Sequence, residues 1–342
     1  MAEVPMLEMK GITKRFPGVL ANDRVDFDLY AGEVHTLLGE NGAGKSTLMK
    51  ILYGLYQAVE GKILLNGGPV EIASPTSAIE HNIGMIHQNF MLVDTLTVAE
   101  NVALGLPSSR GVLTDLDAVS EKIVALGKQY GLEIDPAATV WQLAVGQKQR
   151  VEIIKALYRE ARLLILDEPT AVLTPQEVEQ LFATLHQMTA DGRGLIFISH
   201  KLHEVLALSD RITVLRHGRV TGNTTTEGAT RSSLASMMVG REVKLAPDKP
   251  ETEVGPAALE ISGLRVIGDR GNVVIDDLDL EVHTGEILGI AGVSGNGQRE
   301  LAETIAGLRQ AESGSIVIAG SDVTNQTPAG VRSAGLAYVP EG

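Results

Sequence analysis

A glycine-rich run that ends in a lysine and two hydroxyl residues is the part of this sequence with the most specific chemistry. Residues 39–47 match the pattern G-x-x-x-x-G-K-[ST], in which backbone N–H groups and one ammonium group surround phosphate oxygens. Lys45 would bridge the β- and γ-phosphates of a nucleotide, and the Ser46 hydroxyl would hold Mg²⁺. The sequence therefore predicts a nucleotide-binding loop, made of Gly39, Glu40, Asn41, Gly42, Ala43, Gly44, Lys45, Ser46 and Thr47.

Two carboxylates follow an apolar run further along the chain. Residues 163–166 read as a buried strand that ends at Asp167 and Glu168. In a parallel sheet such an end lies beside the phosphate loop, because ligands gather at the carboxyl edge. We expect Asp167 to complete the Mg²⁺ shell through water and Glu168 to act as general base on the attacking water, or to orient it. An acidic turn after a strand is the alternative.

Two further strand-like runs end in polar residues. Residues 194–199 precede His200, which could reach the γ-phosphate, although a histidine at a strand end can also be a solvated turn residue. Residues 83–87 precede Gln88, whose amide could ligate Mg²⁺ while its loop touches a partner. The apolar residues 90–93 that follow are either a partner surface or core.

A turn at residues 143–147 feeds a helix twenty residues before the two carboxylates. A helix N-terminus preceded by glycine is a natural anion site, so we include Leu143, Ala144, Val145, Gly146 and Gln147 among the candidate nucleotide contacts.

Two aromatic residues lie near these motifs. Phe16 precedes a Pro-Gly turn and could stack on adenine, with packing as the alternative, and we expect Trp141 to be a core residue.

The elements that would position these residues alternate as in α/β proteins. Residues 34–38 form a short apolar run before the phosphate loop, and residues 48–52 continue from it as a helix. Together with the runs at 83–87, 163–166 and 194–199, they predict a largely parallel sheet whose carboxyl edge carries the candidate site.

Composition restricts the function further. The chain has 342 residues, more than one average domain, and 44% of them are hydrophobic. No apolar stretch approaches eighteen residues, no signal peptide is visible, and the absence of cysteine excludes disulfides and thiol chemistry. A formal net charge of −14 argues against a general nucleic-acid binder.

The chain also repeats itself at an offset of about 253 residues. The residues around 7–12 and 25–34 reappear around 259–264 and 278–287, and the phosphate loop reappears at 292–299. In this copy Gln298 replaces the lysine and Arg299 replaces the Mg²⁺-binding hydroxyl, so we expect weak nucleotide binding or no catalysis there. Because nothing matches residues 90–240 a second time, we expect the chain to be a piece of a longer protein.

In this order, these motifs resemble the ATPase domain of ATP-binding-cassette (ABC) proteins. The resemblance implies an α/β fold of the P-loop NTPase class, with a mixed sheet core and a helical lobe around residues 90–160. It divides the chain into a first ABC domain (1–240), a linker (241–258) and the N-terminal part of a second, degenerate ABC domain (259–342). It also implies that two cassettes face each other head to tail, each ATP lying between one phosphate loop and the other cassette's signature.

The family assigns roles to the candidate residues. It implies ATP and Mg²⁺ as cofactors, with Ser46, Gln88 and Asp167 at the metal. Lys45, Gln88, Glu168 and His200 would act in catalysis, Phe16 would lie against the base, and residues 143–147 would be the signature.

The sequence departs from the family pattern at three positions of the first domain. Ala144 replaces the signature serine, Val145 replaces a common glycine, and Thr174 replaces a common aspartate. Because the two cassettes pair head to tail, the altered signature of the first domain would face the altered loop of the second. These two motifs would then belong to the same nucleotide site, and the site that contains Lys45 would remain as the one working site. We therefore expect Mg-ATP binding with slow hydrolysis unless a partner or a second copy supplies a signature.

The tandem layout is similar to ATPase subunits of bacterial importers for simple sugars and nucleosides, and residues 86–101 are closest to the nucleoside branch. This implies two membrane-spanning permease subunits, an extracytoplasmic substrate-binding lipoprotein, a cassette–cassette dimer, and peripheral attachment at the cytoplasmic face of the membrane. Two alternatives remain: a tandem ABC ATPase acting on ribosomes or nucleic acid, and a nucleotide-binding fragment with little activity.

Overall fold

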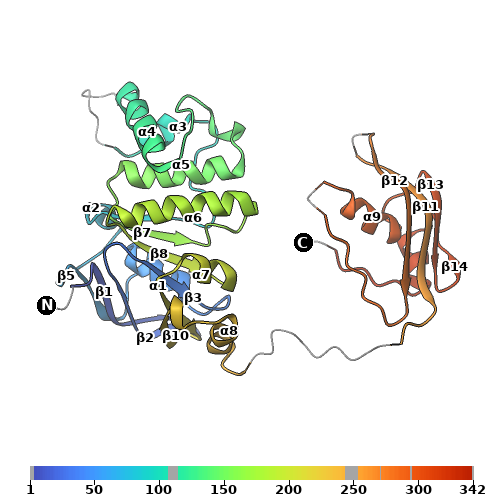
Figure 1. Ribbon diagram of the computed structural model, residues 1–342, viewed down its shortest axis with the longest axis horizontal. Helices are drawn as coiled ribbons and strands as arrows, with labels where there is room; N and C mark the ends of the chain where they lie inside the picture. Colours follow the sequence, from blue (N-terminus) through green and yellow to red (C-terminus); the bar gives the residue numbers. More distant parts are fainter. Residues whose placement is uncertain (1–3, 107–114, 243–252, 270, 293–294, 341–342) are drawn as a thin grey trace. The chain divides into compact units, whose positions relative to one another are not determined.

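The computed structural model describes residues 4–106, 115–242, 253–269, 271–292 and 295–340. The chain divides into two compact units, Met1–Leu245 and Ala246–Gly342 (Figure 1). Most of the expected linker, 241–258, and residues 293–294 of the second loop lie outside the described residues.

A six-stranded sheet forms the centre of the first unit. Its strands, in sheet order, are β10 (Arg219–Thr225), β9 (Arg211–Arg216), β3 (Val34–Leu38), β8 (Gly194–Ser199), β7 (Leu163–Asp167) and β6 (Ile83–Ile86). All neighbours pair in parallel except β10, which is antiparallel to β9. The four strands predicted from apolar runs are confirmed, because a parallel sheet covered on both faces needs such runs.

Alternate residues of these strands enter two different cores. In β8, Ile196 and Ile198 pack with helix α1 (Lys45–Leu52) and with a second sheet, whereas Leu195 and Phe197 pack against the helices of the other face. That second sheet is antiparallel, with the order β2 (Val19–Leu29), β1 (Leu7–Phe16), β4 (Glu60–Leu65) and β5 (Gly68–Val70). The expected mixed sheet core is thereby confirmed.

Helices between β6 and β7 form the predicted helical lobe. They are α3 (Val98–Ala103), α4 (Leu116–Tyr130) and α5 (Val145–Tyr158), and Figure 1 shows α5 beside α6 (Pro175–Ala190), which follows β7. Thr97 caps α3 through a capping box with Glu100, and Thr174 caps α6 in the same way with Glu177. Thr174, at one of the departures from the family pattern, thus serves as a helix cap.

The shorter helices complete the first unit. They are α2 (Pro75–Glu80), η1 (Val140–Gln142), α7 (Leu202–Leu208), η2 (Thr226–Gly228) and α8 (Arg231–Val239). Among the residues that the structure describes, every helix is too short or too polar to span a bilayer.

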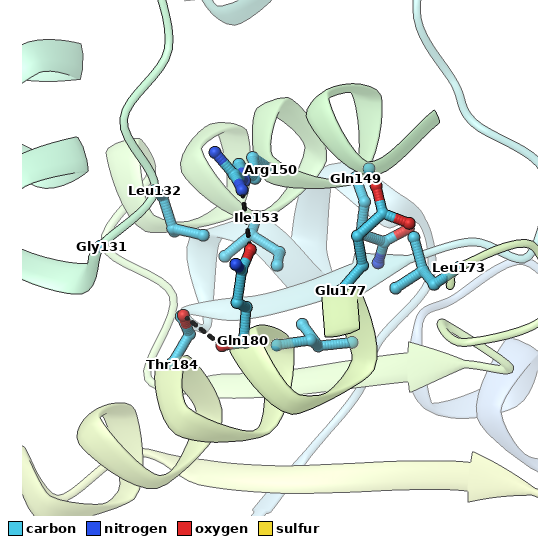
Figure 2. A pocket seen from close by; sticks show the side chains of 11 residues that line it. Gly131, Leu132, Gln149, Arg150, Ile153, Leu173, Glu177, Gln180 and Thr184 are labelled. Atoms are coloured by element: carbon cyan, nitrogen blue, oxygen red, sulfur yellow. Dashed lines mark hydrogen bonds between the residues drawn. The ribbon is translucent and has the colours of Figure 1, made fainter. Parts of the chain in front are cut away.

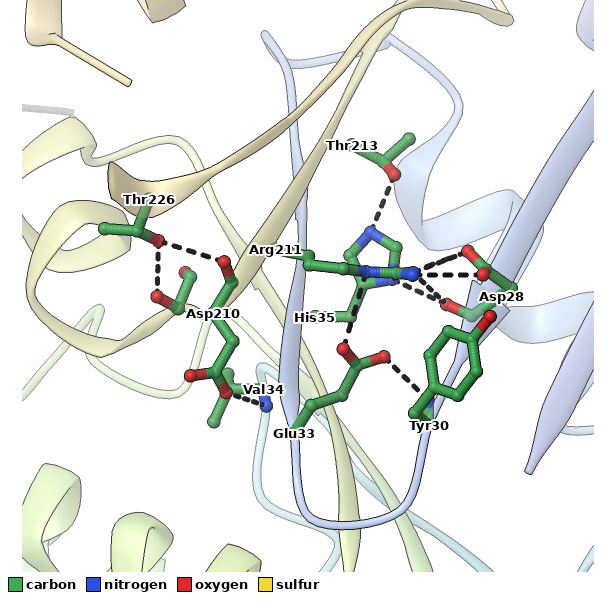
Figure 3. A network of polar contacts seen from close by, with 10 residues as sticks. Asp28, Tyr30, Glu33, Val34, His35, Asp210, Arg211, Thr213 and Thr226 are labelled. Atoms are coloured by element: carbon green, nitrogen blue, oxygen red, sulfur yellow. Dashed lines mark hydrogen bonds and ion pairs between the residues drawn. The ribbon is translucent and has the colours of Figure 1, made fainter. Parts of the chain in front are cut away.

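A buried polar network fixes the amino end of β3 (Figure 3). The His35 ring is 3% exposed, lies 2.8 Å from the Thr213 hydroxyl on β9, and stacks on Phe27 of β2. The Arg211 guanidinium lies 2.7 Å from His35 Nδ1 and 2.6 Å from the Asp28 carboxylate. The network therefore links the antiparallel sheet to the central sheet, at the end of β3 opposite the phosphate loop.

The second unit repeats the order of the first elements. Its members are β11 (Ala257–Ile267), β12 (Val273–His283), α9 (Gln298–Ile305), β13 (Ser313–Ile318), β14 (Ser321–Asp322) and α10 (Pro328–Ser333). The residues equivalent to β3 are in no strand, and Ile287 is 89% and Ile290 54% exposed. In the first unit β3 lies between β8 and β9, whereas the described residues of the second unit offer no such neighbours.

Candidate functional site

The phosphate loop connects β3 to α1 and needs its glycines for steric reasons. Gly42 and Gly44 have φ of 80° and 103°, in the region that favours glycine. A Cβ on Gly44 would lie 2.3 Å from the Ala21 carbonyl oxygen, and one on Gly39 would lie 2.3 Å from that of Leu215. The loop is thus packed between the start of β2 and the end of β9, and its shape excludes larger residues.

Lys45 begins helix α1 and is held inside this loop. The side chain is 5% exposed, and its Nζ donates to the carbonyl oxygens of Gly39 (2.7 Å) and Glu40 (3.0 Å). Burial lowers the pKa of Lys45, while the nearby carboxylates of Glu168 and Asp167 act to raise it. The ammonium group is therefore fixed at the loop, beside the two acidic residues predicted to work with it.

The predicted metal residues come together from two elements. The Ser46 hydroxyl on α1 donates to Asp167 Oδ1 at the end of β7, at 3.4 Å. Burial raises the pKa of Asp167, and the hydrogen bond from Ser46 opposes this shift. The described residues contain no cluster of three or more histidine, cysteine or acidic side chains that could hold a metal. A hydroxyl, a carboxylate and an amide are nonetheless the hard oxygen donors that suit Mg²⁺, which keeps several other ligands.

Glu168 and His200 form a direct pair at the same sheet edge. His200 Nδ1 lies 2.9 Å from Glu168 Oε1, and Gln88 Nε2 donates to Glu168 Oε2 at 3.5 Å. Glu168 has φ of 48°, a backbone conformation uncommon for a non-glycine residue, and such strain often accompanies functional sites. The structure thus brings three predicted residues from three strand ends together, with the Glu168 carboxylate between the other two.

A cavity of about 660 Å³ opens over the phosphate loop. Its wall includes Phe16, 36% exposed at the rim, whose ring meets Tyr56 edge-on at 5.4 Å between centroids. The other lining residues are Val19, Leu20, Ala21, Asn41, Gly42, Ala43, Gly44, Lys45, Ser46, Thr47, Gln88, Glu168 and His217. The cavity is large enough for a nucleotide and joins the predicted base contact to the predicted phosphate contacts.

His217 lines this cavity, although the sequence motifs did not identify it. It lies in the turn between β9 and β10 with φ of 48°, next to Gly218, whose N–H donates to the Ala43 carbonyl. Its only sequence signal was a His-Gly pair after an apolar run, which is typical of many turns.

The signature residues 143–147 do not line this cavity. They precede and begin α5, where the Gln147 side chain accepts the backbone N–H of Ala144 at 3.0 Å. Gly146 faces a separate small cavity between α5 and α6, of about 30 Å³, to which Gln149 and Glu177 also contribute (Figure 2). Contact between residues 143–147 and nucleotide therefore stays a prediction about a facing cassette.

The prediction for Trp141 is wrong. Its side chain is 64% exposed, because the turn η1 buries the neighbouring Val140 in the lobe and directs the indole outward. Residues 90–93 were expected to be either a partner surface or core, and the structure divides them. Leu92 packs against the core of the lobe, whereas Met91 is 64% exposed.

In the described part of the second loop, the two positions that would bind phosphate and metal in the first loop carry other side chains. Gln298 begins α9 in place of the lysine, and the Arg299 guanidinium pairs with Glu303 one turn later, at 2.7 Å. A guanidinium group cannot ligate a cation.

Comparisons with known proteins show what this chain and its fold are similar to. The family model described as ABC transporter matches residues 22–171 and 275–342. All of the chain aligns with 67% of a glucose import ATP-binding protein from Haloferax volcanii at 48% identity, and with 67% of a nucleoside import ATP-binding protein from Lactococcus lactis at 45% identity. The chain thus spans about two thirds of the length of these relatives. An ATP-binding cassette of an ABC transporter, solved in its ADP conformation, is similar in fold, with a TM-score of 0.61, 23% identity, and coverage of 69% of this chain and 99% of that one.

Proposed function

The chain belongs to the ABC transporter family as an import-type ATPase, and we propose how its residues divide the binding and hydrolysis of ATP. One observation supports the division: the predicted phosphate, metal and water-activating residues meet at one edge of the central sheet. Ser46 lies 3.4 Å from Asp167, and His200 lies 2.9 Å from Glu168. The alternative of an ATPase acting on ribosomes or nucleic acid is not favoured, because the relatives are import proteins.

The phosphate loop and Lys45 bind the triphosphate, and Phe16 covers the base. Backbone N–H groups at the start of α1 and the Lys45 ammonium supply positive charge for the β- and γ-phosphates. The half-exposed ring of Phe16 at the cavity rim offers a flat apolar surface for adenine. Nucleotide affinity thus comes chiefly from residues 39–47, and base preference from the rim.

Ser46, Asp167 and Gln88 would hold Mg²⁺. When bound, the ion neutralises charge on the β- and γ-phosphate oxygens. The Ser46 hydroxyl and the Asp167 carboxylate lie 3.4 Å apart, so the hydroxyl would bind the ion directly, Asp167 would complete its shell through water, and Gln88 would add an amide oxygen after the end of β6.

Glu168 orients and activates the attacking water. Its carboxylate contacts His200 through one oxygen and Gln88 through the other, which keeps Glu168 in the wall of the cavity that Lys45 also lines. His200 pairs with Glu168 and is not among the residues that line the cavity, so it would reach the γ-phosphate when the site closes and would then link its presence to the position of Glu168. Hydrolysis is thereby restricted to a closed site in which these side chains are all aligned.

The partners follow from the family. Import ATP-binding subunits imply permease partners and paired cassettes, and we assign this chain two permease subunits, a substrate-binding lipoprotein and a place at the cytoplasmic face of the membrane. The cargo is a simple sugar or a nucleoside. Residues 143–147 face the phosphate loop of a second cassette, and hydrolysis is slow until a complete signature closes over Lys45.

The test is nucleotide binding and turnover by the full chain. Lys45→Ala should abolish Mg-ATP binding in calorimetry. Glu168→Gln should keep binding, lose all but a residual turnover and retain ATP after gel filtration. Steady turnover per molecule that does not change on dilution would contradict the need for a facing signature. Co-purification of two membrane-spanning subunits, rather than ribosomes, would separate import from the alternative class.

A further inference from the structure

A buried carboxylate that is absent from the motifs lies directly behind the Glu168–His200 pair. Glu204 is in the first turn of α7, four residues after His200, and it is 2% exposed. A carboxylate at this depth is costly unless several donors surround it. The hydrogen-bond and ion-pair partners of Glu204 therefore identify the chain segments that it joins.

Three donors reach the Glu204 carboxylate from two chain segments. The Thr170 hydroxyl donates to Oε2 at 2.7 Å and the Ser199 hydroxyl donates to the same oxygen at 3.2 Å, while Lys201 Nζ lies 3.0 Å from Oε1. Thr170 and Ser199 are 2% and 3% exposed, so these bonds are shielded from water.

Further bonds close the network. Lys201 Nζ also donates to the Thr170 carbonyl oxygen at 3.1 Å, and the Lys201 N–H donates to Ser199 Oγ at 3.0 Å. The segment after β7 and the segment after β8 are thus joined to each other through Glu204 and Lys201.

The two joined segments are those that carry the reacting side chains. Thr170 follows Glu168 by two residues, whereas Ser199 and Lys201 lie on either side of His200. Glu168 itself has φ of 48°, and a strained residue keeps its conformation only when its surroundings fix it. The His200 side chain is 44% exposed, so surface packing alone does not hold the 2.9 Å contact with Glu168.

We propose that Glu204 is a positioning residue for ATP hydrolysis, which sets the relative placement of Glu168 and His200 by tying Thr170 to Ser199 and Lys201. This inference rests on the proposed function, since it concerns the hydrolytic step of the same site. Glu204 does not line the cavity over the phosphate loop, so it acts through the two chain segments and not on the nucleotide.

The variant Glu204→Gln keeps the size of the side chain but removes the charge that gathers the three donors. In the full chain we expect the turnover number for Mg-ATP to fall about 10- to 100-fold, the range produced by a displacement of about 1 Å at a reacting group. The Kd for Mg-ATP should stay within about twofold, because the Lys45 side chain bonds to Gly39 and Glu40 and the bonds of this network run among Thr170, Ser199, Lys201 and Glu204. Thr170→Val, which removes one donor without changing volume, should act in the same direction to a smaller extent.

Two matched controls separate positioning from general stability. Glu33→Gln changes a largely buried glutamate at the opposite end of the sheet, and Thr184→Val changes a buried threonine in the middle of α6. Both should keep the turnover number of the unmodified chain. In the Glu168→Gln background, adding Glu204→Gln should lower the residual turnover no further, since both changes act on one carboxylate.

Each result is decisive. Turnover by Glu204→Gln equal to that of the unmodified chain would overturn the inference, as would a parallel loss of turnover and of Mg-ATP affinity. An additive loss in the Glu168→Gln background would assign Glu204 a purely structural role. If Glu204→Gln does not fold, unchanged turnover by Thr170→Val refutes the inference instead. No hydrolysis by the unmodified chain at any concentration would contradict the proposed function itself.

Discussion

Acidification should destabilise the first unit through His35. Burial, and then the positive charge of Arg211, lower the pKa of this imidazole from 6.5 to about 4, although the Asp28 carbonyl and carboxylate act to raise it. The unfolded chain therefore binds a proton that the folded chain excludes between these two pH values. Stability from the neutral ring is fully present above pH 6.5 and is lost as the pH falls toward 4.

The size of the effect follows from the shift. Because the His35 pKa is about 2.5 lower in the folded chain than in the unfolded chain, the free energy of unfolding falls by about 3 kcal/mol once the pH is below both pKa values. Between pH 7.5 and pH 5.0, the same relation gives a loss of about 2 kcal/mol in the free energy of unfolding. Glu33 faces the same network, and burial raises its pKa, which acts in the opposite direction. The comparison must therefore be made between variants at each pH.

Urea denaturation of the full chain at pH 7.5 and 5.0 measures this loss. Fluorescence of the single tryptophan, Trp141, reports on the first unit. We expect His35→Gln, which cannot titrate in this range, to be less stable at pH 7.5 but to lose about 2 kcal/mol less than the unmodified chain on acidification. The exposed His186→Gln serves as control and should follow the unmodified chain. Equal losses for His35→Gln and the unmodified chain would refute the reasoning.

Three other predictions concern the nucleotide site. Phe16→Ala should weaken ATP binding by about 1–3 kcal/mol, the usual contribution of a stacked base, yet leave binding of inorganic triphosphate unchanged in calorimetry. His217→Asn, which tolerates the positive φ of that turn, should weaken ATP binding about fivefold as one hydrogen bond is lost, and unchanged affinity would place His217 outside the contact. Ser46→Ala should retain nucleotide binding but lose most of the increase in affinity that Mg²⁺ produces, as titrations with and without EDTA would reveal.

Much of the fold was predictable because several central strands consist of continuous runs of apolar residues. Residues 34–38 and 194–199 are buried along their whole length, and both runs end where the structure ends the strand. The phosphate loop was equally predictable, since the positive φ at Gly42 and Gly44 and the close approach of Ala21 allow little but glycine. Local sequence is informative wherever local geometry restricts the residue type.

Other features depend on segments that meet only after folding. Trp141 looked like a core residue, but which face of a short turn is buried depends on the lobe that surrounds it. His217 reaches the cavity because β9 lies beside β3, a pairing of residues more than 170 positions apart that no motif encodes.

The sequence by itself determined the family, the phosphate loop and four strands of the central sheet, because each of these follows from short patterns of residue type and spacing. Only the tertiary structure decided that Ser46 lies against Asp167, that His200 lies against Glu168, and that Glu204 joins the segments behind them. Parallel strands bring residues distant in sequence to one edge. The side-chain contacts at that edge depend on how neighbouring strands pack, and no short stretch of sequence determines that packing.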